Sequence, residues 1–140
     1  MITKGRRGSA LIEFAVGLAI LTPVFIGGLQ FFEAYVTTER LQSAITRGAV
    51  SAAALPYESL NETPTAQFKR FAEDTVLESA IPGLRREHIR VSMRFDGGRP
   101  SEVEVKVSGY QLWVPGGAIT LDGKPQAFTP YRGHWSASAR

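Results

Sequence analysis

The stretch that decides the fold is Gly8-Ser9-Ala10-Leu11-Ile12-Glu13-Phe14, which opens an apolar run that continues to Phe32. Between Ser9 and Phe32 the only ionisable side chain is that of Glu13. An α-helix over these 24 residues is about 36 Å long, which exceeds a hydrocarbon core of about 30 Å. We therefore predict a transmembrane helix over residues 9–32.

The charges that flank this run are unequal. The first eight residues carry three cationic side chains, which are Lys4, Arg6 and Arg7, and acidic Glu33 follows the run directly. Lys and Arg near one end of a spanning helix keep that end in the cytoplasm. The sequence thus predicts a cytoplasmic N-terminus and an exported C-terminal part. The run is also longer than the apolar region of about 7 to 15 residues in a secretory signal peptide.

Glu13 is the unusual residue in the predicted span. A carboxylate in a spanning helix costs a few kcal/mol at the bilayer centre and less near an end, and it is a functional candidate by default. Because Glu13 lies only about one turn from the start of the run, its position alone favours a side chain that reaches the headgroups. Both interpretations stay open on position alone.

The spacing around Glu13 resembles the processing site of type IV prepilins. Gly8 is followed after four residues by Glu13 and then by aromatic Phe14, behind a basic leader and at the head of an apolar helix. The resemblance implies that a prepilin peptidase cleaves after Gly8, which makes Ser9 the new N-terminus and Glu13 the fifth mature residue. It also implies that Glu13 pairs with the ammonium of a neighbouring subunit's Ser9, since low-dielectric surroundings strengthen an ion pair.

A narrower resemblance covers residues 6–55, about two fifths of the chain. It rests on three segments, which are Arg6–Ala15, Leu21–Gly27 and Leu41–Ala49 with the alanines that follow. These segments resemble TadE-like proteins, which are pseudopilins or minor pilins of the tight-adherence (Flp) pilus. The resemblance implies an inner-membrane or pilus location. It implies as partners a prepilin peptidase, other pilins or pseudopilins and the inner-membrane assembly platform, besides membrane lipid.

Helical periodicity continues beyond the apolar run. Small and apolar residues recur at helical spacing at Leu41, Ala44, Ile45, Gly48, Ala49, Ala52 and Leu55. We predict one continuous helix from Ser9 to Leu55, in the membrane over its first half and amphipathic outside it over residues 33–55, ending near Pro56. Pro23 predicts a kink within the span, with or without a mechanistic role.

Residues 56–140 predict a small α+β head. Thr63 and Pro64 are typical of a helix start, and they precede an apolar stripe of Phe68, Phe71, Ala72, Thr75, Val76 and Ala80. The stripe is typical of a core face. We expect this helix to end at Pro82-Gly83 and to cover a three-stranded antiparallel sheet.

Alternating apolar residues predict the strands of that sheet. The alternation over residues 89–96 and 102–107 predicts a hairpin with one buried face. If Met93 lies opposite Val105, Arg94 faces Glu104. A third strand is predicted over residues 131–139. Between the second and third strands, we expect a loop-rich connection through 112–117 and 122–125.

Charge and composition exclude several functions. The full chain has 16 Lys+Arg against 13 Asp+Glu, and removing Lys4, Arg6 and Arg7 leaves 13 against 13, so the basic character belongs to the leader. We therefore expect no nucleic-acid partner. The chain has no cysteine and no set of nucleophile, base and orienting residue, and His88 and His134 stand outside any motif. We predict neither an enzyme nor a metal or cofactor site.

Two functions from different classes are consistent with the sequence. The first is a processed pseudopilin with a leader at 1–8, a span at 9–32, a helical extension at 33–55 and a head at 56–140. The second is an uncleaved single-pass membrane protein whose exported head binds a partner. The Gly8-x4-Glu13 motif separates them, since the second function treats it as coincidence.

Overall fold

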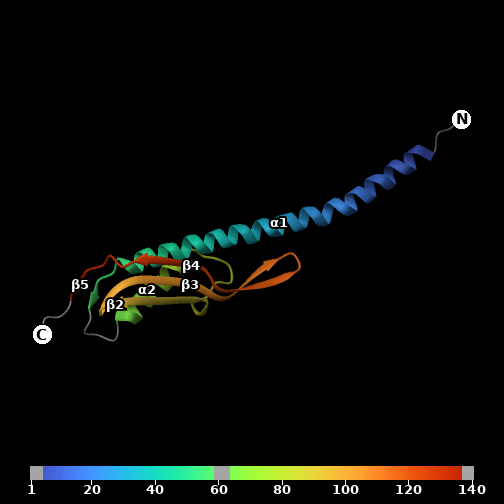
Figure 1. The fold of residues 1–140 in the computed structure, drawn as a ribbon. Coiled ribbons are helices and arrows are strands. Elements are labelled where there is room, and N and C mark those ends of the chain that lie inside the picture. The colour runs from blue at the N-terminus through green and yellow to red at the C-terminus, as the bar shows by residue number, and fades with distance from the viewer. Residues whose placement is uncertain (1–4, 59–63, 137–140) are drawn as a thin grey trace.

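The computed structural model describes residues 5–58 and 64–136, and it shows a long helix joined to a small α+β head (Figure 1). Helix α1 spans Gly5–Ala53 and is 49 residues long. The prediction of one continuous helix is confirmed, within two residues at its C-terminal end. Lys4 and Thr63 lie outside the described residues, and Arg6 and Arg7 lie in the first turns of α1.

Helix α1 is long and apolar enough to cross a membrane, with a mean hydropathy of 2.1 over its most apolar 18 residues. Pro23 lies inside α1 and does not interrupt it. Figure 1 shows a gentle curve along α1, whose N-terminal half extends far beyond the head. A proline removes one helical hydrogen bond but does not end a helix whose other bonds are intact.

The sheet is antiparallel, with the strand order β2-β3-β4, and its strands are Ile89–Asp96, Arg99–Val114 and Gly117–Pro130. The predicted hairpin of the first two strands is confirmed, but its predicted register is wrong by two residues. Met93 lies opposite Val103, and Arg94 lies opposite Glu102. A tight turn at Gly97 and Gly98, both with positive φ, and a bulge beside Arg94 produce this register.

The prediction for the third strand is wrong. It lies at Gly117–Pro130, in the region expected to be loop, and not at residues 131–139. Its register against β3 shifts twice around Ser108, so the alternation that marks a strand is interrupted in the sequence. Of the predicted strand only β5, Trp135–Ser136, forms, and it pairs in parallel with β1, Tyr57–Glu58. Residues 137–139 lie outside the described residues.

Helix α2 spans Pro64–Leu77, and a 3₁₀ turn, η1, follows at Arg86–His88. The helix begins where predicted but ends before Pro82-Gly83, since Ala80 already has a positive φ of 49°. Its stripe is divided between core and surface. Phe68 is 3 % exposed, whereas Phe71 is 43 % exposed.

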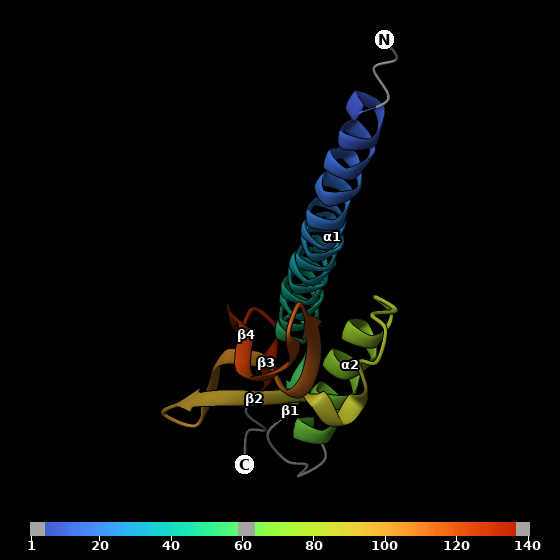
Figure 2. The ribbon, with the colours of Figure 1, turned by 90° about the vertical axis from the view of Figure 1, so that its right-hand side faces the viewer.

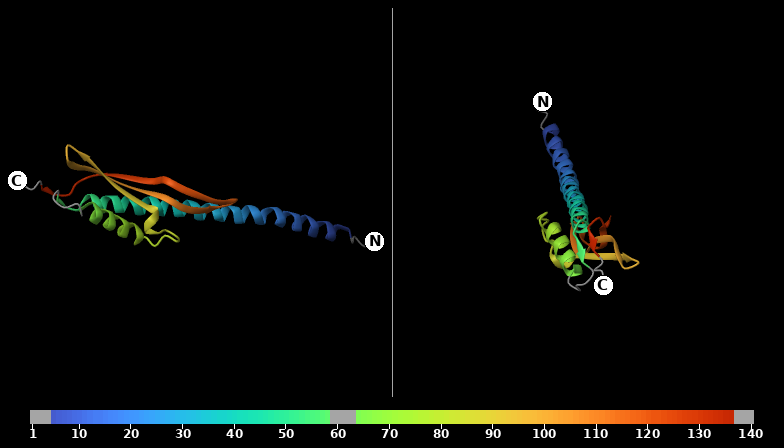
Figure 3. Two further views of the ribbon diagram at one scale, coloured as in Figure 1. Left: turned by 90° about the horizontal axis from the view of Figure 1, so that it is seen from below. Right: turned by 90° about the vertical axis from the view of Figure 1, so that its left-hand side faces the viewer.

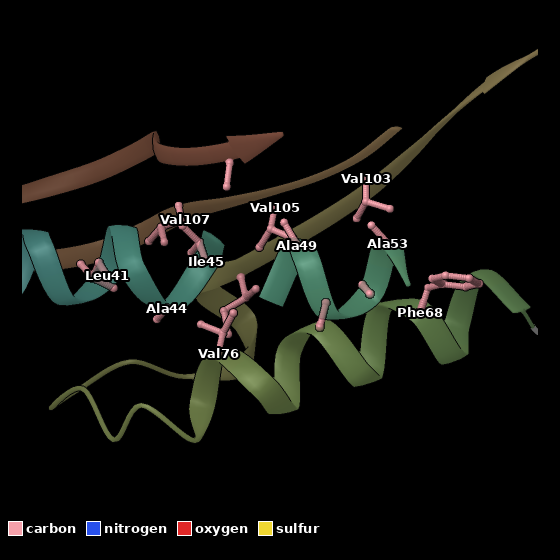
Figure 4. Close-up of a cluster of buried hydrophobic side chains, with 14 of the residues drawn as sticks. Leu41, Ala44, Ile45, Ala49, Ala53, Phe68, Val76, Val103, Val105 and Val107 are labelled. Carbon is pink, nitrogen blue, oxygen red and sulfur yellow. The ribbon is translucent and has the colours of Figure 1, made fainter. Parts of the chain in front are cut away.

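The C-terminal part of α1 forms the centre of the core. Figure 4 shows α1 between α2 on one side and the strands on the other, and Figure 2 shows the same two-sided packing from the end. The buried cluster contains Leu41, Ala44, Ile45, Ala49, Ala52 and Ala53 from α1, Phe68, Ala72 and Val76 from α2, and Val103, Val105 and Val107 from β3. The expectation that α2 covers the sheet holds only in part: α2 contacts β2, while α1 packs against β3 and β4, because its small side chains allow close packing on both sides.

Gly48 is a point of close approach between α1 and α2. A Cβ atom built on Gly48 would lie 2.6 Å from Val76 Cγ2 and 3.1 Å from the backbone oxygen of Ala72. These distances are shorter than carbon contacts of about 3.5 to 4.0 Å. Gly48 is consequently a packing requirement of the α1–α2 interface.

Candidate functional site

The candidate site is the N-terminal half of α1, whose apolar side chains are uncovered in the single chain. Every large apolar side chain from Leu11 to Phe32 is at least 50 % exposed. Fully burying one such side chain stabilises by about 1.5 to 3 kcal/mol, so this surface favours lipid or apolar helices over water. The surface goes around the whole helix, as is typical of a segment surrounded by lipid or by other helices.

The residues of the predicted processing motif lie together in the first turns of α1. Gly8 and Ser9 are both exposed, and nothing lies within 4 Å of a Cβ atom built on Gly8. Glycine weakens a helix by about 1 kcal/mol relative to alanine, and the first turn of a helix lacks part of its hydrogen bonds. The backbone around Gly8 is therefore less firmly held in the helix than the turns that follow.

Ser9 and Glu13 lie one helical turn apart on one face. Ser9 Oγ donates a hydrogen bond of 3.0 Å to Glu13 Oε1. This contact follows from the i, i+4 spacing, which places the two side chains side by side. Phe14 is 70 % exposed beside them, so the carboxylate and an aromatic ring point outward from adjacent positions.

The region around Pro23 has its own local bond. Thr22 Oγ1 donates a hydrogen bond of 2.7 Å to the backbone oxygen of Leu18, one turn earlier. Such a bond from threonine to the carbonyl four residues earlier often bends a helix. The carbonyl that lacks an N–H partner because of Pro23 is that of Ala19, the residue after Leu18. The three glycines of the span, Gly17, Gly27 and Gly28, have nothing within 4 Å of an added Cβ. They leave flat surfaces on which another helix can approach.

Three arginines of the head, at positions 85, 86 and 94, lie beside acidic residues. Arg86 lies 3.5 Å from Glu73, and Arg94 Nη1 lies 3.5 Å from Glu102 Oε2. Arg85 Nη1 lies 3.6 Å from Glu87 Oε1. Paired arginines on an exposed face are typical of a solvated surface and carry no strong attraction for an anionic partner.

The two histidines show no catalytic arrangement in the described part of the chain. His88 Nδ1 accepts a hydrogen bond of 3.1 Å from the backbone N–H of Arg85, and its ring lies 5.9 Å from that of Tyr110. These contacts close η1 against β3. Among residues 5–58 and 64–136, no group of three or more His, Cys, Asp and Glu side chains could hold a metal ion.

Sequence reasoning did not identify one exposed apolar feature, the tip of the β3–β4 hairpin at residues 112–119. Those residues belonged to the predicted loop region, yet Trp113 is 73 % exposed and Ile119 is 51 % exposed. A signal was present in the sequence, because residues 107–121 contain no charged side chain.

Comparison of the chain with family models, with curated proteins and with solved structures finds no match.

Proposed function

We propose that the chain is a minor pilin or pseudopilin of a tight-adherence (Flp) pilus that a prepilin peptidase processes after Gly8. In this proposal α1 anchors the chain in the inner membrane, with the leader in the cytoplasm and the head outside. Residues 9–55 pack against other pilins or pseudopilins at the assembly platform, through the uncovered part of the helix. The chain acts in pilus assembly, without a cofactor and without a nucleic-acid partner.

The observation that carries the proposal is the position of the motif on an uncovered apolar helix. Gly8 and Ser9 are exposed, and Glu13 stands at the head of a segment, Leu11 to Phe32, whose large apolar side chains are all at least half exposed. A lone carboxylate at this depth is costly unless it is paired. An uncleaved anchor gives no reason for a glycine and a carboxylate at this spacing.

Cleavage supplies the partner that Glu13 needs. It converts the Ser9 amide nitrogen into an ammonium, which is one unit of positive charge at the end of an apolar helix. Within one chain, Ser9 Oγ contacts only Oε1 of Glu13, so the second carboxylate oxygen can accept from the ammonium of a neighbouring subunit. Such a charge-assisted bond between chains sets the axial position of neighbouring helices.

The test is the N-terminus of the membrane-purified chain, measured by intact mass and N-terminal sequencing, with and without a cognate prepilin peptidase. We expect a start at Ser9 only when the peptidase is present. The variant Gly8→Leu blocks cleavage, because a branched side chain obstructs the scissile bond. The matched control is Gly17→Leu, which changes an uncovered glycine of the same helix outside the motif and leaves cleavage unchanged.

A start at Met1 under both conditions overturns the processing proposal and favours the uncleaved single-pass protein with a binding head. A second experiment addresses assembly. Glu13→Gln keeps the size of the side chain and removes its charge, so we expect normal cleavage but loss of crosslinking between α1 helices of neighbouring subunits. Unchanged crosslinking would show that helix packing does not need the carboxylate.

A further inference from the structure

The tip of the β3–β4 hairpin is apolar and projects from the head. Between Lys106 and Asp122 the chain carries no charge, and the tip presents Trp113 at 73 % and Ile119 at 51 % exposed. The register pairs Leu112 with Ile119 and Trp113 with Ala118, so both faces of the hairpin are apolar. Leu112 is half-buried against the core, whereas Trp113 and Ile119 are exposed. This pattern differs from the rest of β3, where charged Glu102, Glu104 and Lys106 alternate with buried valines.

The hairpin runs alongside α1 toward the apolar half of that helix. Figures 1 and 3 show its tip beyond the other strands, on the side from which the N-terminal half of α1 projects. The base of the hairpin is tied to α1, because Gln42 Nε2 donates a hydrogen bond of 3.4 Å to the backbone oxygen of Gln126.

The reach of the hairpin along α1 follows from the rise per residue of a strand and of a helix. Gln126 is nine residues from the start of β4 at Gly117, which at about 3.3 Å per residue is about 30 Å, or somewhat less with the bulges. Phe32, where the apolar run ends, is ten helical residues from Gln42, about 15 Å. These lengths assume a straight hairpin parallel to α1, and the two register shifts near Ser108 shorten it. The tip therefore reaches the outer end of the apolar run, and at most about 15 Å past it.

The open strand edges and the tryptophan of the tip suit the boundary between headgroups and acyl chains in a bilayer. Strand β2 pairs with β3 only as far as Val107, so the hairpin beyond it is two-stranded with open edges. Open edges are excluded from the hydrocarbon centre, where unpaired N–H and C=O groups find no water. Tryptophan, with an apolar ring and a polar N–H, is enriched where headgroups meet acyl chains.

We propose that the β3–β4 hairpin tip, residues 112–119, inserts into the outer headgroup region of the membrane beside α1. It forms a second lipid contact that fixes the tilt and rotation of the head on the membrane surface. The inference rests on the part of the proposed function that places α1 in the membrane, and it is independent of cleavage after Gly8. Lipid is the occupant because the tip reaches the outer end of the apolar run, which is the level of the headgroups in a bilayer that surrounds residues 9–32.

The test uses the full chain in vesicles of phosphatidylethanolamine and phosphatidylglycerol that contain brominated phosphatidylcholine, which quenches tryptophan near the acyl chains. The chain has two tryptophans, so Trp135→Phe leaves Trp113 alone and Trp113→Phe leaves Trp135 alone. Strand β5, which holds Trp135, lies at the opposite end of the head (Figure 1). If Trp135→Phe does not fold, the difference between wild type and Trp113→Phe reports Trp113 directly.

We expect brominated lipid to quench Trp113 and to leave Trp135 unchanged. A third probe, Phe25→Trp in a chain with both native tryptophans changed to Phe, reports insertion of α1. Quenching of the Phe25→Trp probe without quenching of Trp113 overturns the hairpin inference and leaves the span intact. A Trp113 shielded from both brominated lipid and aqueous acrylamide indicates a protein contact and overturns lipid as the occupant. An unquenched Phe25→Trp probe overturns both the span and the hairpin inference.

Discussion

Gly48 gives the sharpest test of how α1 is held in the head. In an exposed helix, Gly→Ala stabilises by about 1 kcal/mol, because alanine has the higher helix propensity. At Gly48 the added Cβ meets Val76 Cγ2 at 2.6 Å and the Ala72 backbone oxygen at 3.1 Å. Overpacking of this kind costs about 1 to 3 kcal/mol. We therefore expect Gly48→Ala to lower the free energy of unfolding by about 1 kcal/mol, opposite in sign to the propensity effect.

A double-mutant cycle with Val76→Ala isolates the clash. Val76→Ala removes Cγ2 and creates a cavity, so by itself it destabilises the head by about 2 kcal/mol. With Cγ2 absent, Gly48→Ala fills part of that cavity, and its effect approaches zero or becomes stabilising. We expect a favourable coupling energy of about 1 to 2 kcal/mol between the two substitutions.

The assay is denaturant unfolding of the full chain in detergent micelles, followed by the fluorescence of the two tryptophans in the head. The matched control is Gly28→Ala, because nothing lies within 4 Å of a Cβ at that helical glycine. The packing argument is wrong if Gly48→Ala raises the denaturant midpoint of unfolding, as Gly28→Ala does. It is also wrong if Gly48→Ala changes the free energy of unfolding equally in the wild-type chain and in the Val76→Ala variant.

Three further predictions use the same unfolding assay. Tyr131→Phe removes the 2.7 Å hydrogen bond from the Tyr131 hydroxyl to the Leu55 backbone oxygen, and we expect a loss of about 1 to 2 kcal/mol. Burial raises the pKa of Tyr110 and of Tyr131 above 10.0, so the unfolded chain ionises first and stability falls as the pH rises past about 10. Tyr110→Phe should make that fall shallower, and an equal fall in this variant would contradict the assignment. Arg86→Met removes a cation 3.5 Å from Glu73, whose side chain is 4 % exposed, and leaves Glu73 with Lys69 at 3.8 Å. We therefore expect a loss of about 1 kcal/mol. Adding Glu73→Met should recover stability, and a further loss would show that the carboxylate stabilises through other contacts.

Local signals predicted the helices well. The length of the apolar run and the small residues after it indicated one helix, and α1 extends from Gly5 to Ala53. Proline before a stripe of apolar residues indicated α2, which begins at Pro64. Both signals are properties of neighbouring residues in the chain, so they do not depend on the tertiary fold.

Long-range features were not predictable from the same patterns. The register of β2 and β3 depends on a bulge beside Arg94, and a bulge has no reliable mark in one sequence. Strand β4 was missed because bulges near Ser108 interrupt its alternation. The position of α1 between α2 and the sheet depends on the close approach at Gly48, which one residue type alone does not indicate.

The candidate site was predictable to a different extent. The motif from Gly8 to Phe14 could be found because its spacing is contiguous in the chain, and the structure adds that its residues are exposed. The hairpin tip at Trp113 was not predicted, because its significance depends on the direction in which the hairpin points relative to α1. Only the three-dimensional arrangement shows that an uncharged turn points along α1 rather than away from it (Figure 3).

Because α1 is unbroken, it holds the head in a fixed orientation relative to the apolar segment. The same helix emerges from the apolar segment and forms the centre of the buried core, with no joint between the two. An α-helix turns by about 100° for each residue and each 1.5 Å of rise. A shift of one residue in the contact between neighbouring helices would therefore rotate the whole head by about a quarter of a circle. The axial register of α1 against its neighbour thus determines the direction in which the head faces.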